Sequence, residues 1–393
     1  MVSLTMDVNP KFYDSSNISD LNWGKYIHGD YYQRLFSGML KEGSSAYINN
    51  IDHTVKILTI ENCLYPIVIG NRKKILAKSY VASLYSQYVS YGKREIELEF
   101  KSPFLRRLGK GLLAFIARLF AFSTLDEVVF VNNWLLSTNL YPKEIPTHHL
   151  QILSAFLKEY YPHKAICFRS LNPFLNQKLI NELEDLGYQS VFSRKVFINR
   201  TEQPRAHRNK RNFKHDLKLW KKLSQIYRWE KLENPTKVDL RCIRKLYGDL
   251  YIDKYAQLNP DFSLTFFEEL IERKILNVHV LKDRDNIIAV VGYFLFEGVQ
   301  TASVIGYDRT YPKEHGLYRL ISLKIAELAE ANKAILHASS GVSAFKASRG
   351  LQAHWEYNLI DWSGVAGRKK ISWKALKYLA NDITVPLMKK MDI

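Results

Sequence analysis

The spacing of hydrophobic positions changes repeatedly along residues 299–360 and predicts five elements in the order strand, helix, strand, helix, strand. Runs of β-branched and aromatic residues predict the strands, and apolar residues at every third or fourth position predict the longer helix. The expected elements are a strand ending at 307–308, a helix over 317–332, a strand at 334–338, a short helix around Lys346 and a strand at 355–360.

Polar and turn-forming residues gather where these elements meet. The first strand ends at Asp308, and a turn with Pro312 and Gly316 opens the long helix. The second strand stops at the pair Ser339 and Ser340. Strand ends and a helix start converge on one side of an α/β sheet, where ligands usually bind. The sequence therefore predicts a binding cleft here.

The first half of the chain shows the same order of elements. Three runs rich in β-branched and aromatic residues, at 54–62, 65–71 and 79–92, predict neighbouring antiparallel strands. After them we expect a strand at 127–134, a helix at 148–160, a strand at 164–168, a helix at 176–186 and a strand at 190–198, which closes the first domain.

Two short sequence matches support a duplication. Tyr141 and Tyr311 each begin the sequence Tyr-Pro-Lys-Glu, with an offset of 311 − 141 = 170, and Lys164 and Lys333 each begin Lys-Ala-Ile, with an offset of 333 − 164 = 169. Nearly equal offsets within the same element order indicate a repeated domain.

A chain of 393 residues also exceeds one ordinary core and suggests two domains of roughly 150–200 residues. The predicted organisation is a leading segment at 1–50 packed on the first domain, a first domain at 51–200, a basic linker helix at 201–232 and a second domain at 233–393.

Composition narrows the class of protein. Hydrophobic residues make up 47% of the chain, which excludes a disordered or fibrous protein. The formal net charge of +18 predicts an anionic partner or simply a basic protein. Three widely spaced cysteines favour neither a disulfide framework nor a zinc site, and the absence of a signal-like or membrane-spanning pattern predicts a cytoplasmic protein.

The positive charge is concentrated in the predicted linker. At helical spacing its basic residues share one face, including Arg211, His215 and Lys218, and Phe213, Leu217 and Trp220 share another. Such a helix either presents its basic face to a phosphate-bearing ligand or is a solvated connection between domains.

A second basic amphipathic segment, at 103–122, is either a core-packed helix or a peripheral membrane contact.

Three segments of the second half resemble the GNAT N-acyltransferases, and in particular the Fem-like and BioF2-like (CelD-related) branch with duplicated domains. They are KRNFKHDLKLWKKL at 210–223, similar to the basic helix before the second domain of that group; IIAVVGYFLFEGVQTASVIGYD at 287–308, similar to its central hairpin; and SSGVSAFKASRGL at 339–351, similar to its "YK-x-x-x-G" segment. The resemblance implies an α/β fold with a mixed sheet and two tandem GNAT-like domains.

The chain departs from ordinary GNAT enzymes at two points. The glycine-rich phosphate loop is absent, because residues 312–317 offer only Gly316, and Phe345 stands near the position of the tyrosine that protonates the thiolate in many GNAT enzymes. The first departure leaves the donor open between acyl-CoA, an acyl-carrier protein and aminoacyl-tRNA.

N-acyl transfer requires oxyanion donors and a proton acceptor near an activated carbonyl. Backbone N–H groups at the end of the strand that reaches Asp308 are expected to supply the donors. Asp308 and His315 are the candidate bases, although Asp308 equally suits a turn and His315 a helix start. Tyr307 lies at the same strand end, and the resemblance implies a charge-stabilising role for Lys346.

The remaining candidate residues divide between donor and acceptor. The first turn of the long helix offers N–H groups to a phosphate. The candidates for binding the donor are Gly316, Leu317, Arg211, Lys218 and Arg349, and those for binding the acceptor are Ser339, Ser340 and Trp355.

The leading hypothesis is an N-acyltransferase that moves an acyl group from a thioester to an amine of a small molecule or sugar. It has no tightly bound cofactor and no metal. The second hypothesis is a Fem-type transferase that uses aminoacyl-tRNA. A hypothesis of another class is a non-catalytic basic scaffold that binds nucleic acid or an anionic membrane.

Overall fold

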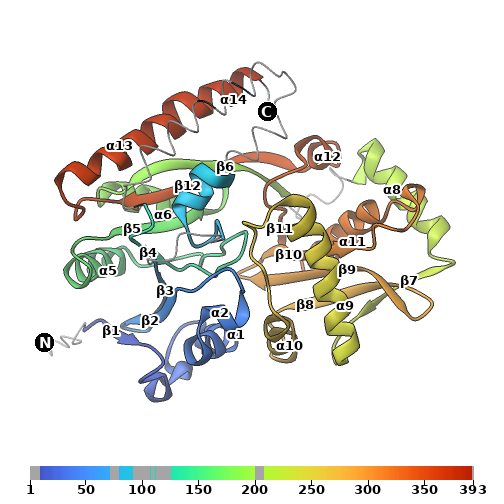
Figure 1. Cartoon of the computed structure of the whole chain (residues 1–393), viewed down its shortest axis with the longest axis horizontal. Coiled ribbons are helices and arrows are strands. Elements are labelled where there is room, and N and C mark those ends of the chain that lie inside the picture. Colours follow the sequence, from blue (N-terminus) through green and yellow to red (C-terminus); the bar gives the residue numbers. More distant parts are fainter. Residues whose placement is uncertain are drawn as a thin grey trace, which may run out of the picture. The chain divides into compact units, whose positions relative to one another are not determined.

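The computed structural model describes residues 9–70, 79–91, 107, 111, 125–199 and 208–391. The chain forms two compact units, shown in Figure 1. Unit 1 comprises Met1–Asn139, Lys143–Ser193 and Glu356–Ile393, and unit 2 comprises Leu140–Pro142 and Arg194–Trp355. Most of segment 103–122, the possible membrane contact, lies outside the described residues.

Unit 1 is built on a sheet with the strand order β1-β2-β3-β4-β5-β12. Neighbouring strands are antiparallel except β4 and β5, which are parallel. The strands are β1 (Lys11–Tyr13), β2 (Thr54–Ile60), β3 (Cys63–Ile69), β4 (Val128–Val131), β5 (Ala165–Leu171) and β12 (Gln352–Asp361). Every residue of β4 and β5 is buried, as expected for central strands covered on both faces.

Helix α6 of unit 1 begins at residues suited to a helix start. Asn172 accepts a hydrogen bond from the backbone N–H of Leu175, and Pro173 occupies the first turn. The helical elements are η1 (Ile18–Asp20), η2 (Trp23–Lys25), α1 (Gly29–Glu42), α2 (Ser44–Tyr47), η3 (Ser86–Tyr91), α5 (Thr147–Tyr160), α6 (Pro173–Asp185), η6 (Gly367–Lys369), α13 (Lys370–Tyr378), η7 (Leu379–Thr384) and α14 (Val385–Met391).

The strand predicted at 79–92 is wrong. Its described residues form turns and the π-helical element η3. Asp126 accepts hydrogen bonds from the hydroxyl of Ser83 and the backbone N–H of Tyr85, so a local side-chain network replaces ladder pairing in this segment. Tyr80, Val81 and Val89 are buried there without forming a strand.

Unit 2 is built on a sheet with the order β6-β11-β10-β9-β8-β7, in which β6 contributes its residues from Arg194 onward. Only β10 and β11 are parallel. The strands are β6 (Gln189–Asn199), β7 (Tyr227–Lys231), β8 (Asn277–Asp283), β9 (Asn286–Phe296), β10 (Val299–Tyr307) and β11 (Ile335–His337).

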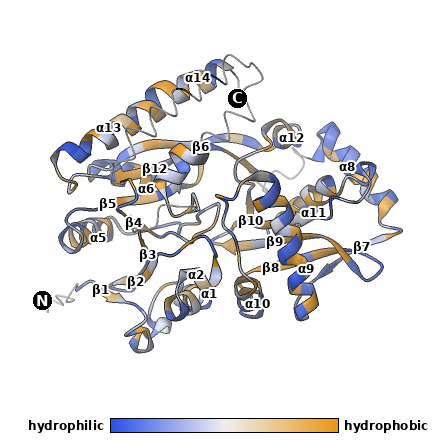
Figure 2. Cartoon of the chain, viewed as in Figure 1, coloured by the Kyte–Doolittle hydropathy of each residue, from blue (hydrophilic) through white to orange (hydrophobic). Residues whose placement is uncertain are grey.

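Helices α8 and α11 share a hydrophobic core with this sheet. Leu320 and Ile321 of α11 pack there beside Val291 of β9, whereas α9 lies against β9 and β10. The helical elements are α8 (Arg211–Leu223), α9 (Lys237–Tyr247), η4 (Gly248–Tyr255), α10 (Leu264–Glu272), η5 (Lys313–His315), α11 (Leu317–Ala331) and α12 (Ser343–Ala347). In Figure 2 the strands are largely hydrophobic, and α8 carries a strongly hydrophilic side.

The last strand of each repeat serves the other unit. Residues Ile198 and Asn199 of β6, at the end of the first repeat, pair with β11 in unit 2. Residues of β12 from Tyr357 onward, at the end of the second repeat, pair with β5 in unit 1. The units therefore differ from the predicted domains at 51–200 and 233–393. The predicted linker helix also ends early, because α8 stops at Leu223 and Tyr227–Lys231 forms the edge strand β7.

The structure confirms the mixed α/β fold. It also shows the repeated order: β4, α5 and parallel β5 in unit 1 correspond to β10, α11 and parallel β11 in unit 2. No disulfide joins Cys63, Cys167 or Cys242. Among the described residues, no helix combines the length and the apolar character needed to cross a membrane.

Candidate active site

Strands β10 and β11 separate in the middle of unit 2. They are paired only from Val299 to Thr301 on β10 and from Ile335 to His337 on β11. Beyond that point β10 continues to Tyr307 with β9 as its partner. We call the region between residues 304–307 of β10 and residues 338–340 after β11 the strand fork.

A β-bulge in β10 determines which side chains lie at the strand fork. The register of β10 against β9 shifts between Thr301 and Val304, which places Ile305 and Tyr307 on the face of the sheet that packs on α11. Asp308 donates its backbone N–H to the carbonyl of Ile288 on β9. Because N–H directions alternate along a strand, those of Ile305 and Tyr307 point away from β9 and toward the fork.

The start of α11 lies in close contact with α8. Gly316 adopts a left-handed conformation with φ +55°, and a Cβ at this position would lie 2.8 Å from Cδ2 of Leu219. Both observations favour glycine at this turn. Helix α11 begins at Leu317, and the N–H groups of a first helical turn form an anion-attracting end. Gly316 and Leu317, which are predicted to bind the acyl donor, therefore lie at a helix N-terminus.

Lys346 is enclosed by the loop that follows β11. Its Nζ donates hydrogen bonds to the carbonyls of Ala338 at 2.6 Å, Ser339 at 3.3 Å and Ser340 at 2.6 Å. Two non-glycine residues of this loop, Ser339 and Val342, have left-handed φ values of 57° and 47°. Such conformations cost free energy, and here they belong to the loop whose carbonyls face a single ammonium group.

Burial of the ammonium lowers the pKa of Lys346 to about 7, and the positive charge of Arg194 acts in the same direction. The ammonium also lies 5.7 Å from the centre of the Phe197 ring. The charge of Lys346 is thus held at the end of β11, beside the backbone of the predicted acceptor residues Ser339 and Ser340. It is directed at the protein's own carbonyls.

Aromatic side chains connect the end of β10 with α12. The ring of Tyr318, in the first turn of α11, lies 6.2 Å from the ring of Tyr307 and 4.9 Å from that of Phe345. The guanidinium of Arg349 stacks on the Phe345 ring, 3.4 Å from the ring centre. Tyr318 was not predicted from the sequence, because its position in the α11 repeat looks like an ordinary helix residue.

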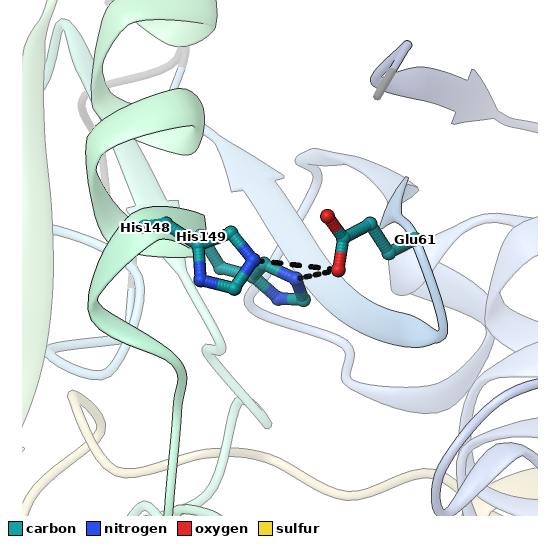
Figure 3. A group of neighbouring side chains, drawn as sticks. All are labelled: Glu61, His148 and His149. Atoms are coloured by element: carbon teal, nitrogen blue, oxygen red, sulfur yellow. Dashed lines mark hydrogen bonds and ion pairs between the residues drawn. The ribbon is translucent and has the colours of Figure 1, made fainter. Parts of the chain in front are cut away.

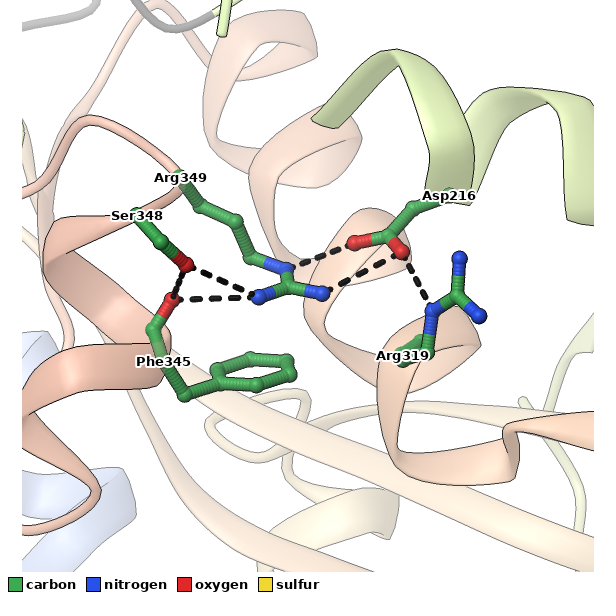
Figure 4. A network of polar contacts seen from close by, with 5 residues as sticks. All are labelled: Asp216, Arg319, Phe345, Ser348 and Arg349. Atoms are coloured by element: carbon green, nitrogen blue, oxygen red, sulfur yellow. Dashed lines mark hydrogen bonds and ion pairs between the residues drawn. The ribbon is translucent and has the colours of Figure 1, made fainter. Parts of the chain in front are cut away.

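Arg349 is held by a buried carboxylate, as Figure 4 shows. Asp216 of α8 accepts hydrogen bonds from Nε of Arg349 at 2.6 Å and from its second nitrogen, Nη2, at 3.2 Å. The same carboxylate accepts one from Nε of Arg319 at 2.6 Å. Arg349 also donates to the carbonyl of Phe345 and the hydroxyl of Ser348. Arg349, a predicted donor-binding residue, is therefore part of a protein network.

The two candidate bases are each held by a local hydrogen bond. Asp308 accepts hydrogen bonds from the backbone N–H and the hydroxyl of Thr310, at 2.9 and 2.7 Å, and so forms a side-chain-stabilised turn. His315 bonds through Nδ1 to the hydroxyl of Tyr227 at 2.6 Å. Tyr227 belongs to the edge strand β7, three strands from β10 in the sheet order.

A second tyrosine completes this edge cluster. Tyr311 donates a hydrogen bond to Asp283 of β8 at 2.9 Å. Burial, followed by that hydrogen bond and the negative charge of Asp283, raises the pKa of Tyr311 to about 12. The cluster of Tyr227, Asp283, Tyr311 and His315 is thus a hydrogen-bonded support for the turn before α11.

The basic face of α8 is exposed. Its buried residues are Phe213, Asp216 and Leu223, and Leu219 and Trp220 pack against the unit 2 core. Leu217, predicted on the apolar face, is 40% exposed. Within the described part of the chain, no ion pair involves the exposed basic residues of this face, which are Arg211, Lys214, Lys218, Lys221 and Lys222.

Trp355, the last predicted acceptor residue, lies on β12 and is partly buried.

In unit 1, buried side chains occupy the position that corresponds to the strand fork. After β4, the side chains of Trp134, Leu135 and Leu136 are completely buried. Arg169 of β5 is also buried and donates hydrogen bonds to the side chain of Asn133 and the carbonyl of Leu136. Among the described residues, every residue of β4 pairs with the parallel strand β5, whereas β10 pairs with the parallel strand β11 only from Val299 to Thr301.

A pocket of about 400 Å³ lies elsewhere, in unit 1. It is lined by Asp361 and Trp362 at the end of β12 and by the lysines Lys370, Lys374 and Lys377 of α13. None of the predicted site residues takes part in it.

Comparison with known proteins gives structural neighbours only. No protein-family model and no curated protein sequence matches the chain. Neighbours include the C-terminal domain of a putative lysylphosphatidylglycerol synthetase from Agrobacterium fabrum, with 11% identity, a TM-score of 0.46 and coverage of 65% of this chain and 84% of that one. FemX has 9% identity, a TM-score of 0.45 and coverage of 59% and 79%.

A tandem GNAT protein from the clavulanic acid biosynthesis pathway aligns over 90% of this chain and 98% of its own, with 8% identity and a TM-score of 0.39. The groups that the sequence resembles, GNAT and Fem-like proteins, thus occur among the structural neighbours.

Proposed function

We propose that unit 2 is an N-acyltransferase that moves an acyl group from a thioester, either acyl-CoA or an acyl-carrier protein, to an amine of a small molecule or sugar. The strand fork is the observation that carries the proposal. At the fork, β11 does not pair with Ile305 and Tyr307 of β10, so it does not accept their N–H groups. These residues are close in sequence to the helix N-terminus at Leu317.

The chemistry needs one site for the developing oxyanion. The amine nitrogen attacks the thioester carbonyl, a C–N bond forms, and the carbonyl oxygen becomes negatively charged. N–H groups directed at that oxygen stabilise the intermediate more than the ground state. In this proposal the N–H groups of Ile305 and Tyr307 fill that role, because alternation along the strand directs them away from β9.

Collapse of the intermediate breaks the C–S bond, and the proton lost by the amine must reach the thiolate. Phe345 has no ionisable group, so another residue must deliver this proton. We assign the protonation of the thiolate to the phenol of Tyr318, which packs against both Tyr307 and Phe345. Asp308 and His315 stay the candidate bases that take the proton from the amine, because a local hydrogen bond leaves each of them an accepting atom.

The donor's phosphate groups would meet the N-terminus of α11 and the basic face of α8. Leu219 of α8 contacts Gly316 directly, which places the two elements side by side. Arg211 and Lys218 are exposed on α8 and lack ion-pair partners among the described residues. Arg349 acts indirectly, by fixing α8 through Asp216.

The test is thiol release from a panel of acyl-CoA and acyl-carrier thioesters in the presence of mixed amines. We expect turnover by the wild-type chain and a loss of 100-fold or more in kcat for Tyr318→Phe, the order typical of a lost general acid. Tyr311→Phe is the matched control, because its hydroxyl is bonded to Asp283 at the sheet edge. Turnover that survives Tyr318→Phe would overturn the proton assignment, and no turnover with any thioester would overturn the thioester donor.

One observation favours a second candidate. The exposed basic residues of α8 form a longer row than one pyrophosphate group needs. A row of this kind suits the phosphate backbone of an aminoacyl-tRNA, which would deliver an aminoacyl ester to the same fork. Retention of charged tRNA at low salt, together with inactivity toward thioesters, would select this candidate. A scaffold would show neither activity, and Tyr318→Phe would then change nothing measurable.

A further inference from the structure

Two adjacent histidines and a glutamate converge on the surface of unit 1, as shown in Figure 3. His148 and His149 belong to the first turn of α5, and Glu61 occupies the two-residue turn between β2 and β3. Nε2 of His149 lies 3.0 Å from Oε2 of Glu61, and Nε2 of His148 lies 3.3 Å from the same oxygen. All three ligand-type atoms lie within 4.8 Å of one another.

The cluster has one buried and one open side. The side chain of His149 is 1% exposed, whereas those of Glu61 and His148 are 25% and 55% exposed. Nδ1 of His149 lies 2.8 Å from the hydroxyl of the buried Tyr65. This second contact fixes the imidazole ring and can accept its Nδ1–H, which leaves Nε2 free to act as a ligand.

The spacing suits a tetrahedral ion. Zinc binds histidine nitrogen and carboxylate oxygen at about 2.0–2.2 Å, so the donors of a tetrahedral site lie roughly 3.3–3.5 Å apart. The two nitrogen-to-oxygen separations, 3.0 and 3.3 Å, are at or just below that range. The two histidine nitrogens lie within 4.8 Å of each other, so the side chains would close around the ion to reach tetrahedral spacing.

We propose that Glu61, His148 and His149 form a binding site for Zn²⁺, with solvent in the remaining coordination position on the exposed side of His148. Two imidazoles and one carboxylate favour zinc over Mg²⁺ and Ca²⁺, which prefer oxygen ligands. The bound ion would connect the β2–β3 turn to the start of α5.

The alternative to a metal site is a hydrogen-bonded group in which both imidazoles donate to Glu61. The two can be distinguished by metal binding to the full-length protein after chelator treatment. Isothermal titration with Zn²⁺, and the visible absorption of Co²⁺ in the same site, report binding without reference to enzyme activity. His148→Ala and Glu61→Gln are the informative variants, since neither side chain is deeply buried.

We expect the wild-type chain to bind one equivalent of Zn²⁺, and each of the two variants to bind it at least tenfold more weakly. His163→Ala is the matched control, an exposed histidine of the same unit outside the cluster, and it should bind like the wild type. A wild-type chain that binds no zinc, or zinc binding that neither variant weakens, would overturn the proposal.

Discussion

The carboxylate of Asp216 on α8 accepts a hydrogen bond from Nε of Arg349 at 2.6 Å, which ties the basic helix to the segment that follows α12. Asp216 is 1% exposed and Arg349 is 7% exposed. The pair is further joined by Arg319 of α11, so one buried carboxylate orients two guanidinium groups. The strand fork is thereby framed by elements that depend on one aspartate.

Replacing Asp216 should destabilise unit 2. Asp216→Ala leaves two guanidinium groups without their carboxylate, and breaking a buried ion pair by removing one partner costs about 3–5 kcal/mol. Asp216→Asn, which keeps the shape and removes the charge, should cost less. Chemical denaturation of both variants measures the free energy of unfolding. Asp285→Asn is the control, because that side chain is fully exposed and its ion pair with Arg228, at 3.4 Å, lies at the surface.

An unfolding free energy for Asp216→Ala within about 1 kcal/mol of the wild type would show that the network contributes nothing to the fold. The assignment of Arg349 to the protein framework would then be wrong, and direct donor binding by Arg349 would return as the better explanation.

The charge of Lys346 should make activity depend on pH near neutrality. Its pKa is about 7, so the ammonium that holds the carbonyls of Ala338 and Ser340 loses its proton as the pH rises through 7. We expect kcat/KM to fall over this range and Lys346→Met to be weakly active without that pH-dependent step. The check is a pH–rate profile, with the exposed Lys237→Met as the control.

The same residue gives a stability prediction of opposite sign. The pKa of Lys346 is lowered from 10.5 in the unfolded chain to about 7 in the folded one, so between these values the unfolded state binds more protons. Stability from this group therefore rises as the pH increases from 7 toward 10.5. In Lys346→Met that increment should disappear, which thermal melts at about pH 7 and about pH 9 can measure. An unchanged increment would contradict burial of the ammonium.

Much of the strand fork could be predicted from local sequence. Pro312 and Gly316 predict a turn before a helix, and the helix starts at Leu317 as expected, because a left-handed residue at a helix start depends on near neighbours only. The exchange of β6 and β12 between the units could not be predicted. Strand partners are determined by long-range packing, and both strands have the apolar character of either sheet.

Side-chain roles were harder to predict than elements. Asp216 is one acid in a basic run, and its burial depends on which face of α8 meets α11. Glu61 lies 87 residues before His148, so their convergence has no spacing signature in the sequence. The family resemblance points to Lys346, but its enclosure by carbonyls depends on the left-handed residues of the loop before α12.

Gly306 should be the least replaceable residue of β10. A Cβ at this position would lie 2.5 Å from the carbonyl carbon of Leu246 and 2.7 Å from the backbone nitrogen of Tyr247, both in α9. Backbone atoms of a packed helix cannot move aside easily, so Gly306→Ala should push α9 from the sheet and cost on the order of 1–3 kcal/mol. Gly367→Ala is the control for glycine loss without crowding, since nothing lies within 4 Å of its Cβ position and its φ is not in the left-handed region. Denaturation curves that rank Gly306→Ala below Gly367→Ala in cost would contradict the close packing of α9 on β10.

The exposed basic face of α8 should control how donor affinity depends on salt. We expect the double variant Lys218→Glu and Lys222→Glu to weaken donor binding, because two positive charges near the start of α11 become negative. If the donor is a nucleic acid, the slope of log affinity against log salt should also become shallower, by about one for each phosphate that the variant no longer neutralises. Titrations at about 50 and about 200 mM salt measure both effects. The double variant Lys237→Glu and Arg241→Glu on α9 changes the formal charge equally and is the matched control. Equal weakening by the two double variants would mean that only net charge matters, and the specific placement of the donor on α8 would then be excluded.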